Sequence, residues 1–203
     1  MDLKSKAFST QMNPHFVFNT LNSIQYFITT EDKKAALTYL SSFSKLIRFY
    51  LSNMGTDMVR LKREIMMLKQ YLKLQKLRYD DKFEYKIHGE IESQDILIPS
   101  FVVHNLLENV IEQGIFHQHQ NQKLDIQFKV GKGIVLTKIH YRYMGLQIKT
   151  AYVPDYREQI VKWQEQIKLL NKVKGYTIEK TIRPIKGGTG FQGTKIEIVL
   201  PIL

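Results

Sequence analysis

The chain of 203 residues contains no cysteine, few acidic residues and no long apolar run. Without cysteine it can form neither disulfide bonds nor thiolate metal sites, although this absence does not identify a cellular compartment. No stretch approaches the ~18 apolar residues that a membrane-spanning helix needs, and the first residues lack the hydrophobic region of a signal peptide. We therefore expect the chain as given to fold outside a bilayer, around a core that its 43% apolar composition can supply.

The shortage of acidic residues leaves the chain strongly basic, with 30 lysines and arginines against 19 aspartates and glutamates. Residues 1–80 hold 13 of these basic residues and six of the acidic ones, so the excess is concentrated there. On one predicted helix, Lys62, Lys69, Lys73 and Lys76 share a face. This face is either simply solvated or an electrostatic dock for an acidic protein domain, anionic lipid or nucleic acid. Nucleic-acid binding is not expected, because no helix-turn-helix or RNA-binding signature accompanies the charge.

The most distinctive segment of the chain spans residues 11–22, where His15 follows Pro14 inside an otherwise helical pattern. A proline inside a helix lacks the amide hydrogen and collides with the carbonyl four residues earlier, which costs about 3 kcal/mol and kinks the helix. The residues around it separate into a polar and an apolar face at helical spacing. The polar face carries Gln11, His15, Asn19 and Asn22. A histidine on such a face is either a solvated bystander or a reactive group presented to a partner.

Residues 11–22 read Gln-Met-Asn-Pro-His-Phe-Val-Phe-Asn-Thr-Leu-Asn, which closely resembles the phosphoacceptor box of LytS-like sensor histidine kinases of two-component systems. The likeness continues through residues 46–51, 59–64, 71–79 and 98–109. It implies that His15 receives the γ-phosphoryl group of ATP and passes it to an aspartate in the receiver domain of a response regulator. It also implies either the cytoplasmic portion of a protein anchored in a bacterial membrane, with a sensor segment before residue 1, or a chain that has lost its sensor.

Hydrophobic periodicity predicts an α+β chain. We expect a helical hairpin from helices 5–28 and 33–52, a linking helix 61–79, and then a mixed domain that opens with strand 83–88. The further predicted elements are helices 100–113 and 155–172 and strands 124–130, 134–143, 176–183 and 194–200. Their order is similar to the ATPase α/β sandwich that histidine kinases share with gyrase and the Hsp90 chaperones.

The predicted elements divide the chain into three parts. Residues 1–58 form the dimerisation and phosphoacceptor hairpin, 59–80 the linking helix, and 81–203 the ATPase-like domain. A hairpin this small leaves much apolar surface uncovered, so we expect a homodimer in which two hairpins form a four-helix bundle.

The resemblance also implies a nucleotide site in the second domain, with ATP and Mg²⁺ as cofactors. Asn109 matches the family asparagine whose carbonyl oxygen coordinates Mg²⁺ between the phosphates, a role that suits this hard cation. Glu108 is the candidate catalytic residue that would orient a proton acceptor or a water molecule. Gln113, Gly145 and Thr194 match further cofactor-binding positions.

Three motifs depart from the family pattern around this site. Glu112 stands where the family has a lysine, so an anion replaces a cation near the phosphates. Residues 141–145 read Tyr-Arg-Tyr-Met-Gly in place of Asp-Asn-Gly-x-Gly, so the adenine amino group loses its carboxylate acceptor. Residues 157–160 read Arg-Glu-Gln-Ile where a glycine-rich lid, Gly-x-Gly-Leu, would cradle phosphates with its backbone amides. These changes predict impaired nucleotide binding.

Two functions follow from this combination, and the sequence does not decide whether the chain is an enzyme. The first is a sensor histidine kinase that phosphorylates His15 from ATP. The second is a pseudokinase that acts as a dimerising scaffold or accepts a phosphoryl group in trans from an active histidine kinase. A metal site at His117 and His119 is disfavoured because no carboxylate or cysteine partners stand at ligand spacing.

Overall fold

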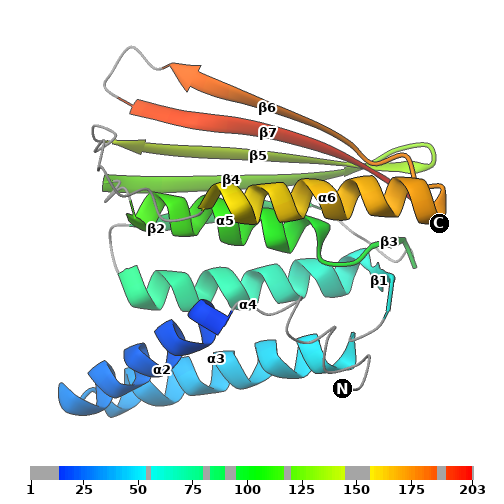
Figure 1. The fold of residues 1–203 in the computed structure, drawn as a ribbon. Helices are drawn as coiled ribbons and strands as arrows, with labels where there is room; N and C mark the ends of the chain where they lie inside the picture. Colours follow the sequence, from blue (N-terminus) through cyan, green and yellow to red (C-terminus); the bar gives the residue numbers. More distant parts are fainter. Residues whose placement is uncertain are drawn as a thin grey trace. The chain divides into compact units, whose positions relative to one another are not determined.

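The computed structural model describes residues 14–53, 56–79, 83–89, 95–116, 120–144, 156–186 and 191–202. These residues fall in two compact units, Met1–Asp80 and Asp81–Leu203. The first unit is helical and the second combines helices with a five-stranded sheet, which confirms the predicted α+β fold class (Figure 1).

The first unit contains helices α2 (Pro14–Thr29), α3 (Lys33–Ser52) and α4 (Leu61–Tyr79) and the short strand β1 (Met58–Arg60). The helix α3 begins after Asp32, whose side chain accepts a hydrogen bond from the Ala35 amide at 2.9 Å and so caps the helix. The predicted bounds of α3 and α4 are confirmed. The predicted start of the first helix at residue 5, and the predicted kink at Pro14, involve residues outside those that the structure describes.

Aromatic packing holds the three helices of this unit together. The buried ring of Phe16 on α2 lies 5.5 Å from the ring of Tyr71 on α4 and 6.4 Å from that of Phe43 on α3, measured between centroids. Rings at these separations contribute about 1 kcal/mol each beyond the burial of their area. The residue that follows His15 is therefore an anchor, and it fixes the beginning of α2 against its neighbours.

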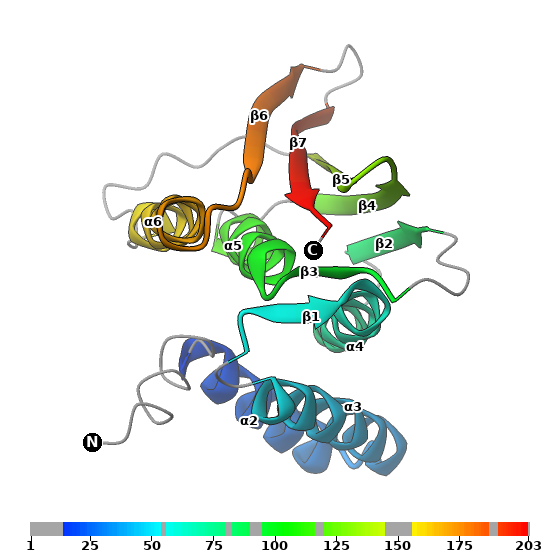
Figure 2. The same ribbon diagram turned by 90° about the vertical axis from the view of Figure 1, so that its right-hand side faces the viewer.

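The second unit contains a sheet with the strand order β2-β4-β5-β7-β6. Its strands are β2 (Phe83–His88), β4 (Gln120–Val130), β5 (Ile134–Met144), β6 (Glu179–Lys186) and β7 (Phe191–Pro201), and a short strand β3 (Leu97–Pro99) precedes the first helix. Only β2 and β4 pair in parallel, and the other neighbours are antiparallel. Helices α5 (Val102–Phe116) and α6 (Tyr156–Lys174) lie side by side against one face (Figure 2).

The strand β5 shows how the sheet distinguishes its two faces. Its residues alternate between buried and more exposed positions along the whole strand, as a sheet covered on one side requires. The buried positions of this strand are Val135, Thr137, Ile139, Tyr141 and Tyr143. They define the inner face, which α5 and α6 cover.

A hydrogen bond from the indole nitrogen of Trp163 on α6 to the carbonyl oxygen of Val102, 2.8 Å long, joins the two covering helices. A second bond, of 3.1 Å, runs from the amide nitrogen of Asn105 on α5 to the side-chain oxygen of Gln166 on α6. These bonds, made by buried and half-buried groups, fix α5 against α6. They therefore position the polar residues that α5 carries.

Candidate phosphoacceptor and nucleotide site

The helix α5 carries two of the predicted site residues, Glu108 and Asn109, on consecutive positions. Their exposed fractions are 7% and 5%, so both side chains are buried. Two polar side chains that merely faced solvent would be far more exposed than this. Burying a carboxylate and an amide costs free energy unless partners satisfy them, so the pair belongs to a polar interior site.

A third polar residue, His104, lies one helical turn before Glu108 on the same face of α5. The imidazole Nε2 is 3.9 Å from the Glu108 carboxylate oxygen, and the histidine side chain has no exposed surface. Burial lowers the pKa of His104 to about 3, so the imidazole is neutral at pH 7. His104 is not among the predicted site residues, although its spacing of four residues from Glu108 is a signal that places both side chains on one helix face.

Acidification is expected to destabilise the second unit through His104. Its pKa is about 3 in the folded chain and near the ordinary 6.5 after unfolding, so the unfolded state binds the proton more readily between these values. Stability should therefore fall by about 1 kcal/mol between pH 6.5 and 5.5. Urea unfolding at the two pH values measures this loss. The variant His104→Gln should lose less, and an equal loss in both proteins would contradict the assignment.

Tyr141, which the predicted motif match aligns with an adenine-binding aspartate, lies on the inner face of the sheet. Its side chain is buried, and its hydroxyl donates a hydrogen bond of 2.9 Å to the side-chain oxygen of Gln122, which is also buried. The ring of Tyr143 lies 5.4 Å away, between centroids. Burial, and secondarily Tyr143, raise the pKa of Tyr141 well above its usual value. The group at this position is therefore a neutral phenol rather than a carboxylate.

Thr194 lies directly opposite Tyr141 in the register of β5 and β7, so the two residues share the inner face. The glycine before it, Gly193, has a packing role of its own. An added Cβ would stand 2.1 Å from the backbone oxygen of Tyr141, and no side chain fits there without moving the strands. The glycine at position 193 thus has a structural explanation that requires no nucleotide.

The remaining predicted site residues are only partly described. Gln113 lies in α5 one turn after Asn109, and His15 lies at the second position of α2, but their side chains are outside the description. Gly145 is among the residues that the structure does not describe. The structure therefore brings together Glu108 and Asn109 on α5, and Thr194 beside Tyr141 on the sheet.

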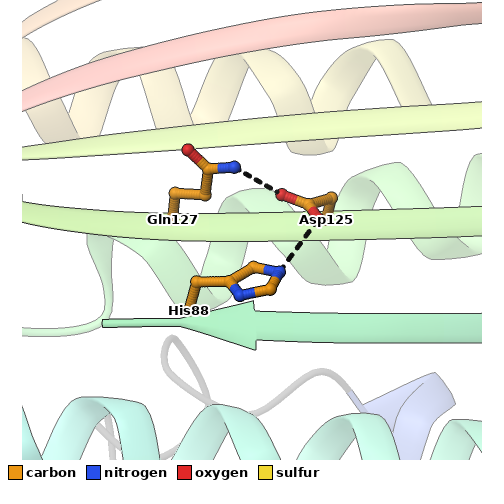
Figure 3. A network of polar contacts seen from close by, with 3 residues as sticks. All are labelled: His88, Asp125 and Gln127. Carbon is orange, nitrogen blue, oxygen red and sulfur yellow. Dashed lines mark hydrogen bonds and ion pairs between the residues drawn. The ribbon is translucent and has the colours of Figure 1, made fainter. Parts of the chain in front are cut away.

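The outer face of the sheet carries a separate polar network, shown in Figure 3. The His88 Nε2 is 3.2 Å from one carboxylate oxygen of Asp125, and the Gln127 amide donates to the other at 3.1 Å. Within the described ranges, no three His, Cys, Asp or Glu side chains are grouped so as to hold a metal ion. His117 and His119, considered above as metal ligands, are outside those ranges.

Comparison with known proteins bears directly on the phosphoacceptor box. The sequence pattern of the family described as histidine kinase matches residues 3–83, which include His15. The sensor protein LytS of Staphylococcus epidermidis is 30% identical over 145 residues, which cover 71% of this chain and 24% of that protein. The chain belongs to the LytS-like histidine kinases.

Other LytS proteins are similar over a shorter stretch. LytS of Staphylococcus haemolyticus is 30% identical over 125 residues, or 62% of this chain and 21% of that protein. The Staphylococcus aureus protein named sensor histidine kinase/phosphatase LytS is 29% identical over the same shares. This LytS-like chain therefore spans less than a quarter of the length of these curated relatives.

Solved structures with a similar fold include other histidine kinases. The Acinetobacter baumannii histidine kinase AdeS aligns with a TM-score of 0.44 and 13% identity, over 91% of this chain and 96% of that one. A mycobacterial sensor histidine kinase, MprB, aligns with a TM-score of 0.44 and 12% identity over 71% of this chain and 97% of that one.

In the part of the LytS-like chain that is described, no helix is both long and apolar enough to cross a membrane.

Proposed function

We propose that this chain is the cytoplasmic core of a membrane-anchored bacterial sensor of a two-component system, and that His15 is its phosphoacceptor. In this proposal residues 1–58 dimerise and carry His15. Residues 59–80 connect this hairpin to residues 81–203, which form an ATPase-like domain. The observation that carries the proposal is the phosphoacceptor box, which lies inside the stretch matched to the histidine kinase family. The packing of Phe16 supports it, because this buried ring anchors the beginning of α2, the helix whose second position is His15.

The proposal includes a nucleotide site that does not fit ATP. Adenine recognition in the family needs an acceptor for the amino group, and here the buried phenol of Tyr141 has its proton committed to Gln122. A buried donor left without a partner costs about 1–3 kcal/mol. Asn109 keeps an oxygen that suits Mg²⁺, so the metal position fits better than the base position. Accordingly, we assign the chain to the pseudokinases, in which the phosphoryl group reaches His15 from an active histidine kinase or from a response regulator.

A homodimer is part of the same proposal, and the exposed apolar residues of the hairpin support it. On α2 these are Phe18, Leu21 and Ile28, and on α3 they are Leu37, Leu40 and Leu51. They are separated by three and seven residues on α2 and by three and eleven on α3, which are close to whole numbers of helical turns, so each helix carries one apolar stripe. Two hairpins packed through such stripes form a four-helix bundle.

One chain has a mass of 23.9 kDa, and light scattering at micromolar concentration is expected to give twice that mass. The change Leu37→Glu places a charge in the apolar stripe of α3 and should weaken the dimer at least about tenfold, because a buried unpaired charge costs several kcal/mol. Leu169→Glu is the matched control, since this leucine of α6 is similarly exposed but lies outside the hairpin. A monomer at high micromolar concentration would rule out the bundle.

The phosphoacceptor role is tested by incubating the chain with radiolabelled ATP and Mg²⁺, alone and together with an active LytS-type kinase. We expect label on the chain only in the second mixture. Label acquired without the partner kinase would contradict the pseudokinase assignment but support His15 as an acceptor. The absence of label in both mixtures, and with a phosphorylated receiver as the donor, would contradict the phosphoacceptor role.

A second candidate function is removal of the phosphoryl group from a response regulator. The Staphylococcus aureus relative has phosphatase in its printed name, and hydrolysis by water consumes no ATP. Asn19 follows His15 by one helical turn, so its amide is a neighbour of the phosphoacceptor position and can orient a water molecule. The test is incubation of the chain with a phosphorylated receiver in the absence of nucleotide. Release of inorganic phosphate would support this second function, and transfer of the phosphoryl group to the chain would support the first.

A further inference from the structure

The helix α4 presents one face on which every charge is positive. Lys62, Lys69, Lys73 and Lys76 are all exposed, and Met66, with 58% of its surface exposed, lies among them. Successive members of this set are separated by three or four residues, so they line one side of the helix. The set spans about 21 Å, at 1.5 Å for each residue. We refer to these five residues as the lysine face.

The two arginines of α4 behave differently, because both have partners within the first unit. The guanidinium of Arg63 donates a hydrogen bond of 3.1 Å to the hydroxyl of Ser52 and lies 5.7 Å from the ring centroid of Phe49. That of Arg78 lies 4.8 Å from the ring centroid of Tyr79. Both arginines are therefore engaged in intramolecular contacts.

Lys62, Lys69 and Lys73, in contrast, form no ion pair with any carboxylate of the described residues. The only acidic residue of α4 is Glu64, which is buried. An ordinary solvated helix face mixes both signs, because opposite charges three or four residues apart stabilise the helix and like charges destabilise it. The uniform sign of the lysine face therefore works against helix stability, and a negatively charged partner would explain it.

The composition of the lysine face distinguishes between classes of partner. Strong protein-binding sites centre on tryptophan, tyrosine and arginine, and nucleic-acid sites use arginine or stacked aromatic rings. The lysine face has none of these. Lysines with flexible stems around a single apolar side chain suit a broad anionic surface, where the ammonium groups reach the phosphates and the stems and thioether contact the acyl boundary.

We propose that the lysine face of α4 binds anionic phospholipid headgroups at a membrane surface. The proposal requires neither ATP binding nor phosphorylation of His15. Each lysine near an anionic membrane strengthens binding roughly fivefold, and the attraction weakens within a Debye length. The four lysines together therefore favour the contact of α4 with an anionic membrane surface.

Co-sedimentation of the whole chain with lipid vesicles tests the proposal. Vesicles of phosphatidylglycerol and phosphatidylcholine should bind the chain at low salt, and vesicles of phosphatidylcholine alone should not. The double variant Lys69→Glu/Lys73→Glu should bind the anionic vesicles at least about 100-fold more weakly, because attraction becomes repulsion at two positions. Raising the salt concentration to 0.5 M should also weaken the binding of the wild-type chain to anionic vesicles.

The matched control is Lys129→Glu/Lys132→Glu, which changes the net charge equally at two exposed lysines of the second unit. It should retain most of the binding. The proposal is overturned if the wild-type chain does not bind anionic vesicles, or if both double variants lose binding equally, since net charge alone would then be responsible. It is also overturned if the chain does not bind vesicles but binds polyglutamate or duplex DNA through the lysine face. Thermal unfolding verifies that both variants are folded.

Discussion

Titration of the chain with ATP and Mg²⁺ in a calorimeter is expected to give no saturable heat up to millimolar nucleotide. Two differences from the family motifs, at Tyr141 and at Glu112, are the reason for this expectation. An adenine amine without its carboxylate acceptor costs about 1–3 kcal/mol, and an anion in place of a cation near the phosphates costs about 1–4 kcal/mol. Together they weaken binding by at least about 30-fold relative to a family member with an intact site. We expect a further loss because residues 157–160, which match the family lid, lack the glycines whose backbone amides would cradle the phosphates.

Variants at two positions make this titration decisive. Tyr141→Phe removes the hydroxyl that bonds Gln122 but keeps the ring, so it should remain unable to bind ATP while losing about 1–3 kcal/mol of stability. An intact kinase of the LytS class serves as the positive control. If the wild-type chain binds ATP saturably and Asn109→Ala abolishes that binding, the site works despite Tyr141. In that case autophosphorylation of His15 becomes the expected activity.

The sequence predicted the long amphipathic elements best. The bounds of α3 and α4 agree with the predicted ranges, because a helical period sustained over five turns leaves little freedom in where the apolar face begins and ends. The short strands β1 and β3 were not predicted. Each has three residues, which is too few for an alternation of polar and apolar residues to be recognised.

The strand predicted at 176–183 begins three residues later, at Glu179, for a reason that lies outside the strand itself. The side chain of Asn171 on α6 donates to the carbonyl of Ile178 and accepts from its amide, at 3.0 and 2.9 Å. These bonds keep the backbone of Ile178 from pairing with a neighbouring strand. Contacts between a helix and the following connection are tertiary, and local alternation does not contain them.

At the candidate site, the sequence pattern predicts which residues are altered, but their contacts depend on tertiary packing. Matching residues 141–145 to the family motif predicted that the adenine acceptor was lost. That Tyr141 would donate to Gln122 depends on the pairing of β4 with β5, which places two residues 19 positions apart on adjacent strands. The burial of His104 likewise follows from how α5 is covered. The identities of the altered residues were therefore predictable, and their partners were not.

Replacement of His15 by glutamine is expected to abolish phosphoryl transfer to the chain from an active LytS-type kinase. The reason is chemical, because the imidazole nitrogen is the nucleophile and a glutamine amide cannot replace it. Folding should be almost unaffected, with a change in the free energy of unfolding within about 0.5 kcal/mol, because the substitution keeps the Phe16 ring contacts that anchor the beginning of α2. The label on the wild-type chain should be stable in alkali and labile in acid, as a phosphoramidate is.

His88→Gln is the matched control for this experiment. Its imidazole is exposed on the outer face of the sheet and pairs with Asp125, so its loss should leave the label unchanged. Label that persists in His15→Gln, or label that resists acid, would assign the phosphoryl group to another residue. Because a pseudokinase depends on its donor, the label on the wild-type chain should also increase with the concentration of the active kinase. A rate independent of that concentration would mean that the chain phosphorylates itself, and the altered nucleotide motifs would then have to be compatible with catalysis.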